Sequence, residues 1–208
     1  MTCQDSTAQD SDILAALRRA TTAQHRLVDC SMPLGASNAD LTTYREHLLL
    51  LRHWLEPVEA WLSLYHDGPQ DPALVSPVWR TPLVVRDLED PALSAVARDA
   101  TLAKPTTAAS LSLQGDAAWR WGACYVIEGS QLGGAVLYKR LSAQLSPHPL
   151  RYLSADGMAP GPRWQAFVIA LRNAVRTRHD IDRACAGAVC LFERLIVSLP
   201  ALAHQGSH

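Results

Sequence analysis

The sequence predicts an all-α fold in one compact multi-helix domain. Apolar residues recur at steps of three and four between Leu41 and Tyr65, and only a helix places such positions on one side. A second apolar segment, Tyr125 to Leu137, reads as a long helix although it contains three glycines. No segment makes a convincing strand, since the apolar residues 83–85 are too few to indicate a sheet.

The chain is predicted to hold one helical domain, residues 11–200, between polar tails at 1–10 and 201–208. Ser11 or Asp12 can cap the first helix, which carries His25. The second helix, over 41–65, contains Pro57, which should kink it because proline lacks a backbone donor.

The region 66–82 is rich in proline and aspartate and is expected to be a loop. Asp116 should cap the glycine-bearing helix, which runs to about Leu145. Four prolines and two glycines then predict a surface connection over 146–162. Further helices are expected over 89–101, 105–113, 162–177 and 181–199.

Composition excludes several classes of function. The 208 residues carry a formal net charge of -1, so no basic field favours nucleic acid or anionic lipid. The five cysteines are odd in number and form no C-x-x-C pair, which fits reduced thiols in a cytoplasmic protein. No signal peptide or membrane span is expected, because the N-terminus is polar and Glu128 interrupts the most apolar segment.

The first helix places three functional groups on one side. His25 follows Arg18 by seven residues and precedes Asp29 by four, so the three share a helix face. A neutral imidazole is a common ligand of iron, and a carboxylate can orient it through its second nitrogen. Arg18 lies about 10 Å along the helix, which suits an acidic group at the rim of a large planar ligand. The competing interpretation is an ordinary core or surface histidine.

Gly129, Gly133 and Gly134 lie in the interior of the long apolar helix. Each costs about 0.5–1 kcal/mol relative to alanine, roughly 2–3 kcal/mol together. Either a flat ligand or a partner helix must therefore approach this backbone closely. Tight helix packing of the G-x-x-x-G kind at 129 and 133 is the alternative.

Other histidines and carboxylates do not form a second site. We expect four of the histidines outside the first helix to be solvated or to cap helices, namely His47, His53, His66 and His179. The paired Glu-x-x-His pattern of di-iron bundles is missing, as are serine hydrolase and phosphate-loop signatures.

The chain resembles the heme oxygenase family, and within it the bacterial branch associated with bacteriophytochromes. Residues 17–25, LRRATTAQH, resemble the family's proximal helix, with the iron-binding histidine at its end. Residues 125–137, YVIEGSQLGGAVL, resemble the distal helix glycine for glycine. Supporting matches fall at 44–48, 54–59, 87–88 and 157–167, and their order and spacing extend the resemblance over nearly the whole chain.

The resemblance implies an enzyme for which heme is both substrate and cofactor. The expected products are biliverdin, carbon monoxide and ferrous iron, formed with O2 and electrons from another protein. His25 would bind the iron, with Asp29 orienting it. Gly129, Gly133 and Gly134 would hold the distal backbone close to the heme, so that oxygen leans toward a meso carbon. The propionates would be bound by Arg18, Tyr125 and Arg172.

One position departs from the animal-type enzymes of the family. Those carry an aspartate on the distal helix where this chain has Ser130. The resemblance makes Ser130, acting through water, a candidate for proton delivery. A ferredoxin or flavin reductase is implied as electron donor and a bacteriophytochrome as biliverdin acceptor.

Two other functions stay open on the sequence. A heme-binding or heme-delivery protein of this fold would lack turnover, as the missing aspartate allows. A thiaminase-type helical enzyme is disfavoured because its catalytic cysteine and carboxylates have no visible match.

Overall fold

All regular structure in the described part of the chain is helical. The computed structural model describes residues 12–32, 34, 39–96, 113 and 115–199. In chain order the elements are α2 (Ile13–Ser31), α3 (Leu41–Leu62), η2 (Gly68–Gln70), α4 (Thr81–Leu88), α5 (Pro91–Val96), α6 (Ala117–Leu141), η3 (Ala155–Gly157), α7 (Pro160–Ala174) and α8 (Arg178–Ser198). This confirms the predicted all-α class. None of these helices is long and apolar enough to span a bilayer.

The predicted helices recur with shifted ends. Asp12 and Asp116 cap α2 and α6 as expected, because their carboxylates accept backbone N–H groups of the first turn. The predicted 66–82 loop is interrupted by η2, and α4 begins at its end. Of the predicted helix 89–101, α5 covers 91–96. Ser11, both tails and nearly all of the predicted helix 105–113 lie outside the described residues.

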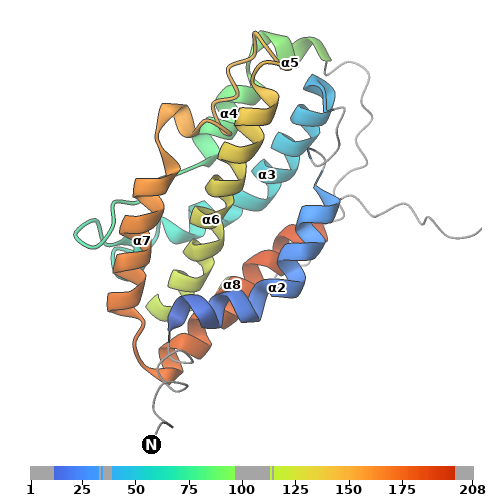
Figure 1. The fold of residues 1–208 in the computed structure, drawn as a ribbon. Helices are drawn as coiled ribbons and strands as arrows, with labels where there is room; N and C mark the ends of the chain where they lie inside the picture. The colour runs from blue at the N-terminus through green and yellow to red at the C-terminus, as the bar shows by residue number, and fades with distance from the viewer. Residues whose placement is uncertain (1–11, 33, 35–38, 97–112, 114, 200–208) are drawn as a thin grey trace, which may run out of the picture.

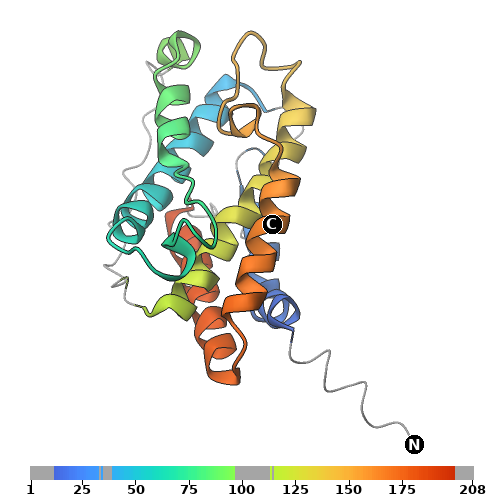
Figure 2. The same ribbon diagram turned by 90° about the vertical axis from the view of Figure 1, so that its left-hand side faces the viewer.

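The long helix α6 occupies the centre of the bundle (Figure 1). It packs most extensively against α8, and it also contacts α7 and η2. The view from the side shows α7 running beside α6 (Figure 2). α2 lies on α8, while α3 packs against α4 and α5. α2 and α6 contact each other at few residues, and α8 packs against both of them.

The connection between α6 and α7 is fastened to α4 by one carboxylate. Asp87 is fully buried and accepts a hydrogen bond from the Tyr44 hydroxyl at 2.6 Å. It also accepts from the backbone N–H of Arg151 at 3.0 Å and of Tyr152 at 2.9 Å. These bonds hold the Tyr152 backbone against α4, and its side chain is buried.

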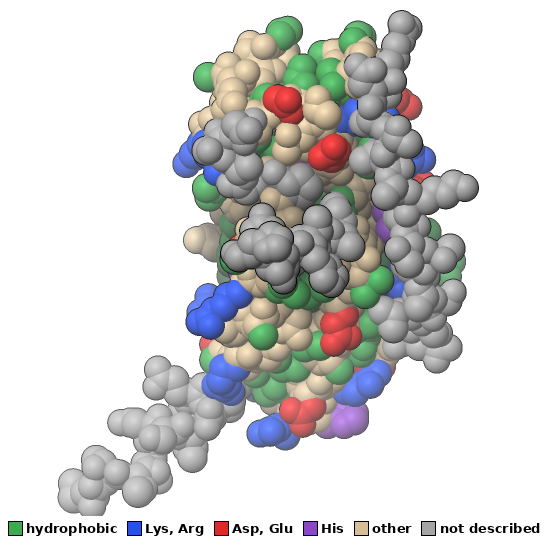
Figure 3. All heavy atoms as spheres, turned by 90° about the vertical axis from the view of Figure 1, so that its right-hand side faces the viewer, with side chains coloured by type: hydrophobic (Ala, Val, Ile, Leu, Met, Phe, Trp, Pro, Cys, Tyr) green, Lys and Arg blue, Asp and Glu red, His purple; other side chains and the backbone are tan. Residues whose placement is uncertain are grey.

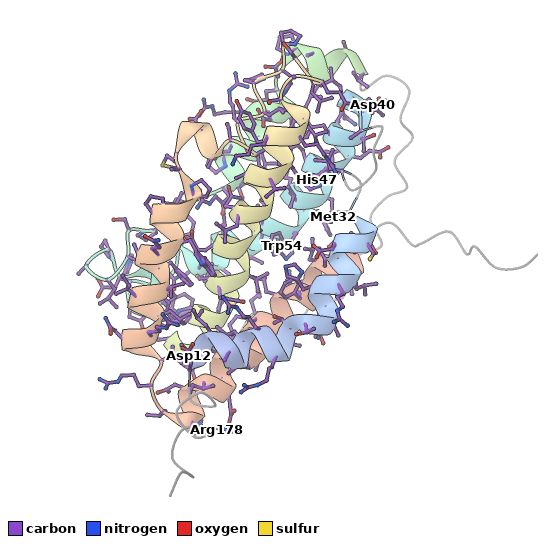
Figure 4. All side chains as sticks on the ribbon, in the orientation of Figure 1. Asp12, Met32, Asp40, His47, Trp54 and Arg178 are labelled. Carbon is purple, nitrogen blue, oxygen red and sulfur yellow. The ribbon has the colours of Figure 1, made fainter. Side chains whose placement is uncertain are left out.

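The prediction that His47 is solvated or caps a helix is wrong. Its side chain lies on α3, seven residues before Trp54, and is only 3% exposed (Figure 4). Nδ1 has no hydrogen-bond partner, and burial lowers the pKa of the imidazole to about 4. The burial of His47 could not be predicted, because the apolar seam of α3 runs through neighbouring positions and not through 47 itself.

We expect the protein to lose stability as the pH falls from about 6.5 toward 4. In that range the unfolded chain protonates His47 while the folded chain does not, so acid favours unfolding. At pH 5 the loss from this residue is about 2 kcal/mol. Denaturant unfolding of the wild type and His47→Leu at pH 7 and pH 5 would measure it. The variant should lose about 2 kcal/mol less between the two pH values.

His66→Leu is the matched control, because His66 is exposed. Its loss between pH 7 and pH 5 should equal that of the wild type. An equal loss in His47→Leu as well would show that His47 does not carry the effect.

Candidate functional site

The two halves of α2 differ in their surroundings. All its buried residues lie in the first half, namely Ile13, Leu14, Ala16, Leu17 and Thr21. No residue from Thr22 to Ser31 is buried, and the Leu27 side chain is 42% exposed. Figure 4 marks the two ends of this helix with Asp12 and Met32. The half that carries His25 therefore presents a surface that the described residues leave largely uncovered.

His25 is oriented by Asp29, as the spacing predicted. Nδ1 of the imidazole lies 2.8 Å from Oδ2 of Asp29, and both side chains are 64% exposed. When Nδ1–H donates to the carboxylate, Nε2 carries the free lone pair. The imidazole ring also packs 6.0 Å from the ring of Phe192 on α8. Metal-binding histidines in other proteins commonly make this contact with an outer carboxylate.

The glycines of α6 and α8 fall into two groups. A Cβ added at Gly122 would lie 1.7 Å from the carbonyl oxygen of Ala184 on α8, and one added at Gly187 would lie 2.1 Å from that of Trp119. These two glycines permit the close packing of α6 on α8. Neither glycine lies in a segment whose pattern predicted this packing.

The predicted site glycines have no such partner. A Cβ at Gly129 would meet only the Trp164 ring at 3.8 Å, and one at Gly134 would meet Leu153 at 3.7 Å, both ordinary contacts. At Gly133 no described atom lies within 4 Å. Tight packing against the described helices therefore does not explain glycine at 129, 133 and 134. The cost of these residues points to something else that approaches the α6 backbone.

Ser130 has its hydroxyl turned to its own helix. Oγ donates to the carbonyl oxygen of Ile127 at 2.7 Å. The oxygen keeps its lone pairs for a further donor, such as water. Ser130 is half-buried at the edge of the open glycine surface.

The three predicted propionate partners lie toward the first half of α2. Burial raises the pKa of Tyr125, and the neighbouring Arg18 guanidinium opposes this shift, so α2 and α6 approach each other here. Arg172 on α7 is ion-paired with Asp12, its Nη2 3.1 Å from Oδ2. This bond with Arg172 lowers the pKa of Asp12, with a smaller contribution from Arg18. Arg172 is the farthest from His25, because Asp12 precedes His25 by a rise of about 20 Å.

Charge around the site is mixed. On the face drawn in Figure 3, blue and red side chains alternate among green ones, without a broad field of one sign. Within the described ranges, no group of three His, Cys, Asp or Glu side chains is placed to hold a metal ion. A single oriented imidazole beside an open surface suits iron whose other ligands come from a planar macrocycle.

Comparisons with known proteins agree with this geometry. A family model described as heme oxygenase matches residues 11–199. A heme oxygenase of Xanthomonas campestris pv. campestris (strain 8004) is 30% identical over 178 residues, which cover 81% of this chain and 95% of the relative. The match includes both the His25 helix and the glycine-bearing α6. The chain belongs to the heme oxygenase family.

Proposed function

We propose that heme lies between the second half of α2 and the glycine surface of α6, and that the chain cleaves it there to biliverdin. The placement is supported by an exposed His25–Asp29 pair on α2 together with site glycines on α6 that no close contact with a described atom requires. Heme oxygenases use heme as substrate and cofactor and release biliverdin, carbon monoxide and ferrous iron.

His25 is the proposed iron ligand through Nε2. Asp29 holds the imidazole in the tautomer that leaves Nε2 unprotonated. Phe192 packs beside the ring and limits its rotation.

Gly129, Gly133 and Gly134 are proposed to let the α6 backbone lie close over the opposite face of the heme. Because these positions have no side chains, the α6 backbone can approach the heme closely. The space between backbone and heme is then narrow and would restrict where oxygen binds, while backbone groups offer hydrogen bonds. Trp164, in contact distance of a Cβ at Gly129, forms the neighbouring wall. Ser130 is the proposed hydroxyl at the edge of this surface.

Arg18 and Tyr125 are the best supported partners for the heme propionates. They approach each other from α2 and α6, and the guanidinium provides a bidentate cation for a carboxylate. Arg172 joins them in the proposal, but it must exchange its Asp12 carboxylate for a propionate. These contacts would set the rotation of heme about the iron and so the meso carbon that is attacked.

The electrons and the fate of the product require other proteins. The sequence has no flavin or iron–sulfur motif, so we propose a ferredoxin or a flavin reductase as donor. A bacteriophytochrome is the proposed acceptor of biliverdin. A cytoplasmic location is proposed because the described cysteines, Cys30, Cys124, Cys185 and Cys190, are free thiols.

A heme carrier of the same fold is the second candidate, favoured by Ser130 at the position of the distal aspartate. The test is an absorption spectrum of the protein with one equivalent of hemin, followed after addition of a reductase system under air. A Soret band that decays as a biliverdin band grows supports the oxygenase. A stable Soret band would favour the carrier, and failure to bind hemin would refute both.

Gly133→Val tests the proposed position of the heme. We expect heme affinity or turnover to fall at least tenfold, about 1.4 kcal/mol, because the new side chain occupies the space over the macrocycle. Folding should be unaffected, since no described atom lies within 4 Å of a Cβ there. Hemin titration and thermal unfolding of the variant would measure the two effects.

Gly161→Val on α7 is the matched control, because a Cβ at that helical glycine also meets nothing within 4 Å. It should bind and degrade heme like the wild type. Normal heme degradation by Gly133→Val would contradict the proposed close approach of α6.

A further inference from the structure

Four aromatic side chains of α6 and α7 form a continuous column. The ring of Tyr125 lies 5.6 Å from that of Trp164, and Trp164 stacks on Phe167 at 6.0 Å with an interplanar angle of 24°. Phe167 continues the column to Trp121 at 5.4 Å. Phe167 and Trp121 are each 1% exposed, whereas Trp164 and Tyr125 are half-buried. The column is therefore anchored in the core at Trp121 and reaches the surface at Tyr125.

Trp164 also borders the glycine surface. Cζ3 and Cη2 of its indole lie 3.8 and 3.9 Å from the position of a Cβ on Gly129. Gly129 follows Tyr125 by four residues, so the two positions share one side of α6. One indole thus contacts the Tyr125 ring and forms the edge of the glycine surface. The neighbour of Gly134, Leu153, is only 1% exposed and presents no free surface.

An ion pair fixes the position of Trp164 along α6. Nε of the preceding residue, Arg163, donates to Glu128 at 3.0 Å, and Glu128 directly precedes Gly129. Nη1 of Arg163 donates to the carbonyl oxygen of Ser76 at 2.6 Å. Because the Glu128 side chain is only 8% exposed, breaking this pair would leave a buried charge without its partner. Residues 163–164 of α7 are therefore held opposite residues 128–129 of α6.

Tyr125 is the point at which the column meets the proposed propionate contacts. Its side chain is hydrogen-bonded to that of Arg18 on α2. The ring packs against Trp164, and aromatic pairs have preferred relative orientations. The direction of the Tyr125 hydroxyl therefore depends on the indole. A change at Trp164 would move this hydroxyl without altering Tyr125 or Arg18.

We propose that Trp164 determines the rotation of heme about the iron, and thereby the meso carbon that is cleaved. The inference rests on the proposed function, in which heme lies on the glycine surface with its propionates at Arg18 and Tyr125. The periphery of heme carries charged propionates on one side and apolar methyl and vinyl groups elsewhere. Rotation would therefore bring a different group against the indole. Trp164 acts as a positioning residue in two ways, as a flat apolar wall beside Gly129 and as the support of Tyr125.

The first test uses the protein loaded with hemin and does not require turnover. Proton NMR of the ferric cyanide complex resolves the heme methyl groups, and each orientation of the heme gives its own set of signals. The wild type should show one predominant set. In Trp164→Leu the ratio of the predominant to the minor set should fall at least about fivefold, about 1 kcal/mol. An unchanged ratio would overturn the proposal.

Trp164→Phe tests whether the aromatic ring itself matters. This variant keeps a ring between Tyr125 and Phe167, and it should restore most of the wild-type preference. A ratio as low as that of Trp164→Leu would contradict the role of the column in supporting Tyr125.

Trp61→Leu is the matched control. Trp61 is also a half-buried tryptophan between aromatic neighbours, with Tyr65 at 5.2 Å and Trp119 at 5.5 Å. Trp119 precedes Gly129 by ten residues, a rise of about 15 Å along α6. The control should lower the Tm but keep the wild-type ratio of heme orientations. A fall as large as that in Trp164→Leu would show that lost stability causes the effect, and would overturn the assignment.

The second test is the ratio of biliverdin isomers, separated by chromatography after turnover. Trp164→Leu should form a second isomer in proportion to the second heme orientation, whatever its total rate. A single isomer, as in the wild type, would overturn the proposal. If the wild type binds hemin without degrading it, the oxygenase proposal fails, and the NMR ratio still decides the role of Trp164. Failure of the wild type to bind hemin would overturn both.

Discussion

Replacement of His25 by alanine is expected to lower heme turnover at least about 100-fold. Loss of an outer partner of a metal ligand typically costs 10–100-fold, so loss of the ligand itself should cost at least the upper value. The fold should be preserved, because the side chain is 64% exposed and alanine is a strong helix former. Biliverdin formation by His25→Ala, measured with and without added imidazole, would test the assignment.

Imidazole should restore part of the turnover, because a small free ligand can enter the space that the deleted ring leaves beside Phe192. His179→Ala is the matched control, since His179 is an exposed histidine on α8. It should degrade heme at the wild-type rate. Full turnover of His25→Ala without imidazole would refute His25 as the iron ligand.

Local signals in the sequence predicted most of the fold. Asp12 and Asp116 cap their helices because a carboxylate satisfies N–H groups two or three residues away, an interaction contained in the sequence order. The prediction failed at α4, an eight-residue helix whose first N–H groups are capped by Glu59 from α3. Glu59 precedes Arg80 by 21 residues and Thr81 by 22 residues, so this cap forms only in the folded chain.

The site shows the same division. The contact of His25 with Asp29 lies within one helix, and its i,i+4 spacing predicted it. His25 contacts Phe192 on another helix, and a Cβ at Gly129 would contact Trp164 on another helix. No local sequence pattern predicts contacts between helices. The burial of the Gln131 amide could not be predicted either, because polar residues within a helix are more often solvated.

Glycines illustrate why function and packing are hard to separate in a sequence. The penalty of glycine in α6 is the same at 122, 129 and 133, yet only Gly122 meets backbone of another helix. The close packing of α6 on α8 therefore depends on Gly122, which lies outside the segment 125–137. At 129 and 133 the described residues make no such contact.

Gly122→Ala is therefore expected to damage the fold. The new Cβ would lie 1.7 Å from the Ala184 carbonyl oxygen, and backbone on both sides must move. Overpacking of a core costs about 1–3 kcal/mol, and a clash with backbone belongs at the upper end. At about 3 kcal/mol the Tm of a chain of this length should fall by about 6–12 °C. Thermal unfolding of the purified variant would measure it.

The matched control is Gly161→Ala, which places the same methyl group in a helix where nothing lies within 4 Å. Its Tm should stay close to that of the wild type, because the added methyl group meets no described atom within 4 Å. The backbone movement in Gly122→Ala should also weaken heme binding, because α8 packs against both the His25 half of α2 and the start of α6. An unchanged Tm in Gly122→Ala would mean that α6 and α8 do not pack as closely as the structure shows, and the spacing between His25 and the glycine surface would then be set by other contacts.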